Sequence, residues 1–327
     1  MTQGKRYAII GLTILTTGAL RMPFERKMTD DLNQAGLLPP KLEQRTGEKI
    51  GQTFSAVSLG GLRTLVATFM NLRAFTFFQE QSWGEVGDTY ELIVDLAPRT
   101  RYYWDTGSWH QAYNAASYYL YGSELPPLRR KANWRACILR GREFLERGIR
   151  NNPNDPILKH RLGTLYSDPN KINAFGDPSK AYEQAYEACM SATKTPNAPS
   201  YSKRFALYSL ARVPGREKEA LELLKEIESE GGNPLPTIYS LSYTLRYHDA
   251  PTQPVMKLID SIFPSRRLAY DILSTHWQRS HDRFPMFGVA DGIALLETDL
   301  KIPQNESAFK QDLLHPMNPD DYFLPNK

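Results

Sequence analysis

Apolar stretches at helical spacing alternate along this chain with clusters of residues that end helices. From Gln52 onward the apolar positions follow the period of an amphipathic helix. The clusters between them are rich in proline, glycine, asparagine and aspartate, as in "NNPNDP" at 151–156 and "EGGNPLP" at 230–236. Proline has no N–H to donate and disfavours helix in the residue before it, so these clusters mark helix ends. With no convincing strand pattern in the sequence, we predict an all-α body.

These boundaries predict helices at 52–80, 83–96, 101–121, 131–151, 156–167, 179–193, 200–211, 215–229, 236–248, 254–263, 265–281 and 286–299. Ser82 and Glu85 have capping-box spacing, in which each side chain satisfies a free backbone N–H at the other position. After Pro303 the chain is polar and rich in proline, which predicts an extended tail over 303–327.

The first 22 residues have a basic start followed by an apolar run. Lys5 and Arg6 precede the run, which ends in small residues before Arg21. This order is typical of a secretory signal peptide, and the same run retained would be a membrane anchor. It is about 14 residues long, against the ~17–25 that normally cross a bilayer. We expect residues 1–22 to export or tether the chain, on the periplasmic side of a bacterial inner membrane, with a linker over 23–51.

A second apolar region, residues 54–78, contains Arg63, Asn71 and Arg73 and has no uninterrupted stretch of spanning length. We expect it to form a buried helix. The chain has 40 Lys and Arg against 36 Asp and Glu, and the small excess is spread along the sequence. We therefore do not expect nucleic acid as a partner.

An internal helix-pair pattern is visible in the middle of the chain. The first-helix pattern L-G-x2-Y is filled within "KHRLGTLY" at 159–166. The second-helix pattern is filled upstream, with small residues in both small positions, by Gly141, Leu145, Gly148 and Pro153. Its small-residue spacing recurs at Ala181, Ala185 and Ala188. These motifs resemble the tetratricopeptide repeat (TPR) family.

The resemblance is good over 83–193 and only architectural over 236–300. It implies a right-handed superhelical solenoid of antiparallel helix pairs, with repeats over 52–232 and further helix pairs over 233–302. Small residues would let the two helices of a pair touch. The repeats are degenerate, because "SDPNKINAFGDP" lengthens one loop and Gly107 stands where leucine is expected.

Alignment with the family implies that the first helices of the two best repeats face a concave surface. The residues expected on it are Tyr102, Asp105, Trp109, Tyr113, His160 and Thr164. Family members that clamp a terminal carboxylate use lysine and asparagine at such places, so the sequence does not predict that activity. Tyrosine and tryptophan offer large, rigid contact area, which suits a ligand surface formed by Trp109 with Tyr102 and Tyr113. Packing between helices is the alternative for these rings, and it is the expected role of Trp104, Tyr118 and Tyr119.

The resemblance implies a non-catalytic scaffold for protein–protein interaction. Together with the first 22 residues, it predicts an adaptor that helps to assemble or stabilise a cell-envelope complex by binding membrane or envelope subunits. Two alternatives stay open. One is a periplasmic module that binds glycans or peptides through the aromatic face, and the other is an enzyme with an unrecognised site around His276, His281 and Asp282.

We expect no cofactor and no metal site. His276 and His281 are five positions apart and lack the glutamate of an H-E-x-x-H motif. Cys137 and Cys189 fall in the second helices of different repeats, offset by about twelve positions, which would separate them by ~18 Å. That separation exceeds disulfide reach, so we expect two buried thiols.

Overall fold

The computed structural model describes Lys27 and residues 62–310 except 233, 281 and 282. Within these residues every regular element is a helix and no strand is present, which confirms the all-α class. The expected signal or anchor segment, the linker apart from Lys27, and the end of the tail lie outside the described residues. None of the described helices combines the length and apolar character needed to cross a membrane.

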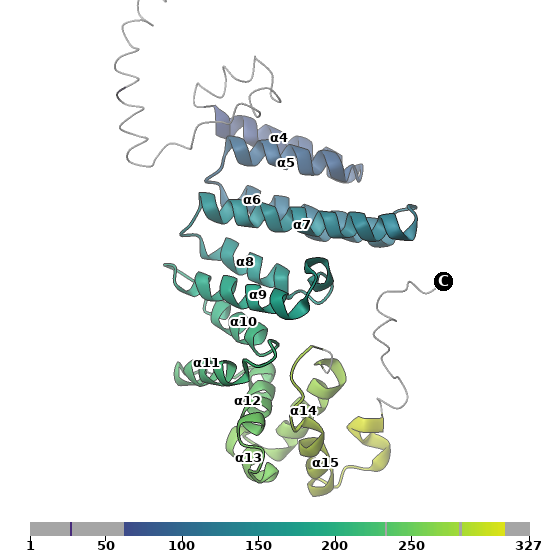
Figure 1. Cartoon of the computed structure of the whole chain (residues 1–327), viewed down its shortest axis with the longest axis vertical. Coiled ribbons are helices and arrows are strands. Elements are labelled where there is room, and N and C mark those ends of the chain that lie inside the picture. Colours follow the sequence, from purple (N-terminus) through teal and green to yellow (C-terminus); the bar gives the residue numbers. More distant parts are fainter. Residues whose placement is uncertain (1–26, 28–61, 233, 281–282, 311–327) are drawn as a thin grey trace, which may run out of the picture. The chain divides into compact units, whose positions relative to one another are not determined.

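The chain divides into two compact units, residues 1–103 and 104–327, with the division inside helix α6. Figure 1 shows the order of the helices along the chain. The first unit contains α4 (Arg63–Gln79), α5 (Trp83–Leu96) and the start of α6 (Arg101–Trp109). The second continues with η1 (His110–Ala115), η2 (Tyr118–Gly122), α7 (Pro127–Asn151), α8 (Pro156–Ser167), η3 (Ile172–Phe175), α9 (Pro178–Thr193), α10 (Tyr201–Leu210), α11 (Glu217–Ser229), α12 (Pro236–Asp249), α13 (Val255–Ile262), α14 (Arg266–Ser280), α15 (Val289–Asp299) and η4 (Gln304–Glu306).

The helix boundaries predicted from the sequence agree with the structure to within a few residues over the described part of the chain, and α5 and α8 have the predicted bounds. Helix α7 begins at Pro127 rather than at residue 131, because proline at the first helical position lacks only an N–H that would be unpaired there anyway. The region predicted as one α-helix over 101–121 contains two π-helical segments, η1 and η2.

The predicted capping box at the start of α5 is wrong. Ser82 occupies the N-cap position, but its side chain makes no capping hydrogen bond. The structure caps α8 instead, where the Asp155 carboxylate accepts the backbone N–H groups of Ile157 and Leu158 at 2.9 and 3.1 Å. Asp177 caps α9 in the same way. Aspartate directly before proline is therefore the start signal of α8 and α9, whereas the proline-initiated helices α7 and α12 have no side-chain cap.

In the first unit, α4 and α5 lie side by side (Figure 1). The hydroxyl of Tyr90 on α5 donates to the side-chain oxygen of Asn71 on α4 at 2.9 Å. The guanidinium of Arg63 donates to the backbone oxygen of Asp95 at 2.8 Å. Ala67 and Ala74, each about one turn from Asn71 on the same side of α4, are buried. One side of α4 therefore packs on α5.

In the second unit, glycines bring helices into direct contact. A Cβ atom added to Gly163 of α8 would lie 2.3 Å from the Cys189 sulfur and 2.9 Å from the Ala185 oxygen, both on α9. A Cβ added to Gly141 of α7 would lie 2.6 Å from the Ala112 Cβ on η1. Only glycine fits these contacts, so the small positions of the sequence pattern do allow close approach of paired helices.

Helices α12 to α15 pack around a different core. Tyr243 of α12 is fully buried, and its hydroxyl donates to the backbone oxygen of Gly288 at 2.7 Å. Leu273, Ile293 and Leu296 are buried in the same cluster. The expected tail begins with η4 and then packs on this body, because Ala308 is buried and its N–H donates to the Glu297 carboxylate at 2.8 Å.

Both cysteines are free thiols. Cys189 is buried as expected, and burial raises its pKa to about 12. Cys137 is only partly buried, so the expectation of two buried thiols is wrong at that position. Its pKa is raised to about 11 by the same cause.

Candidate functional site

One side of α4 carries large apolar side chains that the described residues leave about half exposed or more. The face consists of Leu62, Leu65, Phe69, Leu72 and Phe75, which we call the α4 face. The last four of these side chains are 51 to 63% exposed. The expectation of a buried helix over 54–78 is therefore wrong for the described residues 62–78, because α5 covers only the side of α4 that carries Ala67, Asn71 and Ala74.

The spacing of the α4 face is that of a helix–helix seam. Positions 62, 65, 69 and 72 follow one another by three, four and three residues, which keeps them on one line along a helix. The neighbouring Arg73 holds its guanidinium over the Phe77 ring, 5.4 Å from its centroid. A contiguous exposed apolar surface of this kind is typical of an interaction site.

The residues expected on a concave face fall in both units. Tyr102 is exposed in the first unit, with its ring against Tyr103. In the second unit, Trp109 is 49% exposed and stacks on Tyr113, with the ring centroids 4.3 Å apart. Asp105 forms an ion pair with Arg161 of α8 at 3.4 Å. The exposed ring of Trp109 therefore remains a surface on which a flat ligand could stack.

His160 is not accessible, which corrects the expectation that it faces a partner. Its ring packs against the rings of Tyr201 and Phe205 of α10, at centroid distances of 4.7 and 4.9 Å. The Ser202 hydroxyl lies 3.4 Å from its Nδ1 atom. Burial lowers the His160 pKa to about 4, so the ring is neutral near pH 7. It is a contact between α8 and α10, not a base.

The structure brings Tyr113 and Thr164 together at one cavity of about 400 Å³ in the second unit. Helices α8, α10 and α14 contribute half of the residues that line it, including Phe205 and Tyr208. Asp168 and three arginines also line it: Arg212, Arg279 and Arg283. We call this space the arginine-lined cavity. Alignment identified Tyr113 and Thr164, but the arginines come from loops and helix ends that the repeat pattern does not cover.

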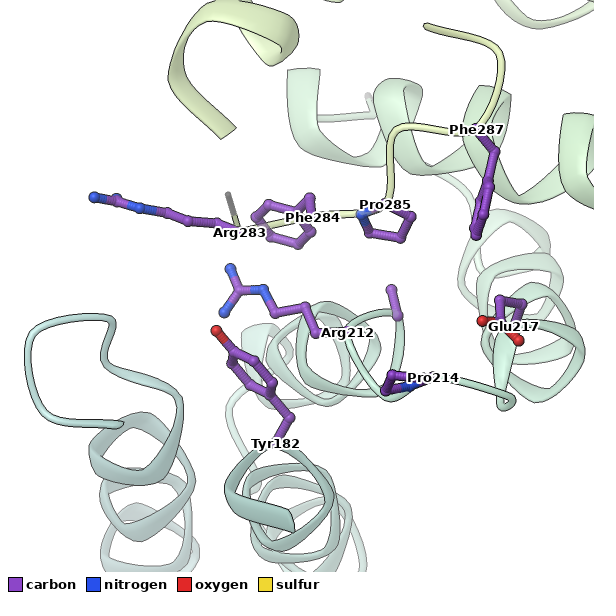
Figure 2. A pocket seen from close by; sticks show the side chains of 9 residues that line it. Tyr182, Arg212, Pro214, Glu217, Arg283, Phe284, Pro285 and Phe287 are labelled. Carbon is purple, nitrogen blue, oxygen red and sulfur yellow. The ribbon is translucent and has the colours of Figure 1, made fainter. Parts of the chain in front are cut away.

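A second cavity of about 330 Å³ shares Arg212, Arg283 and Phe284 with the first. Figure 2 shows the guanidinium of Arg212 between Phe284 and Tyr182, with the side chain of Arg283 extending away to one side. The guanidinium carbon is 3.9 Å from the Phe284 ring centroid and 5.0 Å from that of Tyr182. Burial, and then the nearby charge of Arg283, lower the pKa of Arg212.

The histidine of the alternative enzyme site is a packed residue. His276 is buried, and its Nε2 lies 3.2 Å from the backbone oxygen of Pro285. Burial lowers its pKa. His281 and Asp282 lie outside the described residues. Among the residues that the structure describes, no group of three or more His, Cys, Asp or Glu side chains could hold a metal ion.

The α4 face was missed from the sequence because its residues were counted as one apolar stretch. The signal was present: the apolar positions at 62, 65, 69 and 72 lie on the opposite side from the small and polar positions 67, 71 and 74. A helix with two such sides packs on a neighbour through one of them and leaves the other open. Comparison of the chain with known protein-family models and with curated proteins found no match.

Proposed function

We propose that the chain is a non-catalytic adaptor of TPR-like helical-repeat architecture that binds a partner protein through the α4 face. The observation that carries this proposal is the exposure of Leu65, Phe69, Leu72 and Phe75 along one line of a helix. Burying each such side chain stabilises a complex by about 1.5–3 kcal/mol before the cost of association, so the face is sufficient to anchor a partner.

The partner that this face fits is an apolar side of another helix. The three-and-four spacing matches the seam of a helix pair, in which each side chain enters a gap between residues of the facing helix. Within the proposal, the partner is a membrane or envelope subunit, and residues 1–22 export or tether the adaptor beside it. Fractionation with N-terminal sequencing of the mature chain tests this proposed cellular location independently.

A photo-crosslinking amino acid at position 69 tests the proposal directly. We expect it to form a discrete adduct with one protein in intact cells, while the same amino acid at the exposed position 85 on α5 does not. Phe69→Ser with Leu72→Ser should abolish an adduct formed from position 65. A protein labelled equally from 69 and 85 would contradict the proposal, as would the absence of any adduct.

Binding of the purified chain to lipid vesicles separates a partner protein from a membrane surface. If the purified chain bound lipid vesicles through the α4 face and no protein adduct formed, the face would be a membrane contact and the adaptor proposal would fail. Phe69→Ser with Leu72→Ser is the variant for that arm, and Glu85→Ser is its matched control.

A second candidate function is a binding module for glycans or peptides, favoured by the half-exposed Trp109 stacked on Tyr113. Sugar rings and peptide side chains both pack on exposed tryptophan rings. Screening the purified chain against glycan and peptide arrays tests it. Binding that is lost in Trp109→Ala and kept in Phe69→Ser would support this function over the adaptor.

A further inference from the structure

Three arginines from separate segments converge on the arginine-lined cavity. Arg212 follows α10, Arg279 lies in the last turn of α14, and Arg283 follows that helix. Residues more than sixty positions apart in the sequence therefore place positive charge in one space of about 400 Å³. The segments that follow α10 and α14 each bring a guanidinium into a wall that also contains Phe284.

Arg279 and Arg283 are exposed to solvent, whereas Arg212 is only partly exposed. No described carboxylate forms an ion pair with Arg212, Arg279 or Arg283. The Nε atom of Arg212 is buried without a hydrogen-bond partner. A buried donor without an acceptor costs about 1–3 kcal/mol, so a ligand that supplied acceptors here would gain binding energy.

The acidic residue in the cavity is already engaged. The charge of Asp168 raises the pKa of the Tyr113 hydroxyl above its ordinary value, after the larger effect of burial. The Asp168 carboxylate accepts the backbone N–H of Asn170 at 2.8 Å. In the adjoining cavity, Glu217 accepts the backbone N–H of Gly215 at 3.0 Å. Neither carboxylate forms an ion pair with Arg212, Arg279 or Arg283.

We propose that Arg212, Arg279 and Arg283 bind a phosphate monoester that is attached to an aromatic or other apolar group. A phosphate monoester carries a charge of about −1.5 to −2 near pH 7 and three acceptor oxygens, whereas a carboxylate carries one charge and two oxygens. Guanidinium groups form paired hydrogen bonds with phosphate oxygens, and three of them require more acceptors than a carboxylate offers.

The walls specify the rest of the ligand. Phe205, Tyr208 and Phe284 line the cavity beside the arginines. The volume of about 400 Å³ is far larger than a bare phosphate needs, since one water takes about 30 Å³ in the liquid. An aromatic group bonded to the phosphate would pack on these rings while the arginines hold its charge. This site lies in the second unit and does not depend on the proposed role of the α4 face.

Calorimetric titration and thermal unfolding of the full chain with phenyl phosphate test the site. We expect saturable one-to-one binding and a raised unfolding temperature. Inorganic phosphate should bind at least tenfold more weakly, because it lacks the ring, and benzoate at least tenfold more weakly, because it lacks the second charge. Phenyl phosphate that did not saturate, or benzoate that bound equally well, would overturn the proposal.

Charge-removing variants locate the binding to this cavity. Arg279→Gln and Arg283→Gln should each weaken phenyl phosphate binding at least tenfold. Arg267→Gln is the matched control, because Arg267 lies on the same helix as Arg279, is exposed and pairs with Asp271 at 3.2 Å. Arg212 is packed between two rings, so its variant is not needed for the decision. Unchanged binding in both cavity variants, or an equal loss in Arg267→Gln, would refute the site.

Discussion

Glycines serve opposite purposes in two regions of the second unit. In α7 and α8 they let helices touch: Cβ atoms at Gly141 and Gly163 would meet backbone oxygens 2.9 Å away. Around α15 they make room for tyrosine, because Cβ atoms at Gly288 and Gly292 would lie 2.3 Å from the Tyr247 ring and 2.7 Å from the Tyr243 hydroxyl. The repeat-like pattern is therefore readable at Gly141 and Gly163, where glycine fixes helix spacing. Its third glycine, Gly148, instead makes room for Trp104, whose Cβ and Cγ would lie 2.9 Å from an added Cβ.

The largest expected effect is at Gly163. Gly163→Ala should lower the free energy of unfolding by about 3 kcal/mol, because α8 and α9 must separate to admit a methyl group. Urea denaturation of the purified chain measures this change. Adding Cys189→Ala removes the sulfur but leaves the Ala185 oxygen, so it should restore only part of the loss. Full restoration would show that only a side chain limits the spacing and would remove the distinction between the two regions.

Acid should destabilise the chain through His160. The folded pKa of about 4 lies below the ordinary value of 6.5, so between these values the unfolded state binds more protons. The stabilisation is fully present above about pH 6.5 and is lost as the pH falls towards 4. We expect a loss of about 2 kcal/mol between pH 7 and 4.5 from this residue.

Comparison of wild type with His160→Gln isolates that contribution, because every other titrating group is shared. The difference in their free energies of unfolding should shrink as the pH is lowered. A difference that stayed constant from pH 7 to 4.5, or an NMR titration giving His160 an ordinary pKa, would contradict the buried contact between α8 and α10.

A double-mutant cycle examines the tyrosine-adapted region. Gly292→Ala should cost about 1–2 kcal/mol because its Cβ would lie 2.7 Å from the Tyr243 hydroxyl oxygen. Tyr243→Phe should cost about 1 kcal/mol by removing the hydrogen bond to Gly288. The double variant should cost at least ~0.5 kcal/mol less than the sum, since removal of the hydroxyl makes room for the methyl group. Strict additivity of the two free-energy changes would mean that Gly292 is not needed to make room for the Tyr243 hydroxyl.

The smallest expected effect has the opposite sign. Gly84 in α5 has no heavy atom within 4 Å of an added Cβ. Gly84→Ala should therefore raise the free energy of unfolding by about 0.5 kcal/mol, because alanine restricts the unfolded chain and favours helix. Urea denaturation of the variant and the wild type measures this change in the free energy of unfolding. A loss of stability would show that helix glycines in this protein are sensitive for reasons other than local contact.

The sequence could predict helix positions because proline and aspartate act locally at each end. It could not predict the π-helical segments η1 and η2, whose hydrogen bonds are one residue longer than those of an α-helix and leave the apolar pattern almost unchanged. The failed cap at Ser82 has a similar origin, because spacing alone does not fix the side-chain rotamer.

The candidate site was predictable only where a motif fixes the helix face. Alignment placed Tyr113 and Thr164, which line one cavity, and Trp109, which stacks on Tyr113. It failed for His160, because Tyr201 and Phe205 of the next helix pair cover that position. The arginines could not be grouped in advance, since the fold of the segment after α14 onto α10 brings them together.

Because Cys189 of α9 packs against Gly163 of α8, the reactivity of its thiol also reports how often these two helices separate. Its pKa of about 12 and its burial leave it unreactive while α8 rests on α9. In a Cys137→Ser background, the rate at which a small reagent labels Cys189 would therefore follow the frequency with which these two helices part. That rate gives the free energy of a single helix–helix contact in the native chain, far from conditions that unfold it.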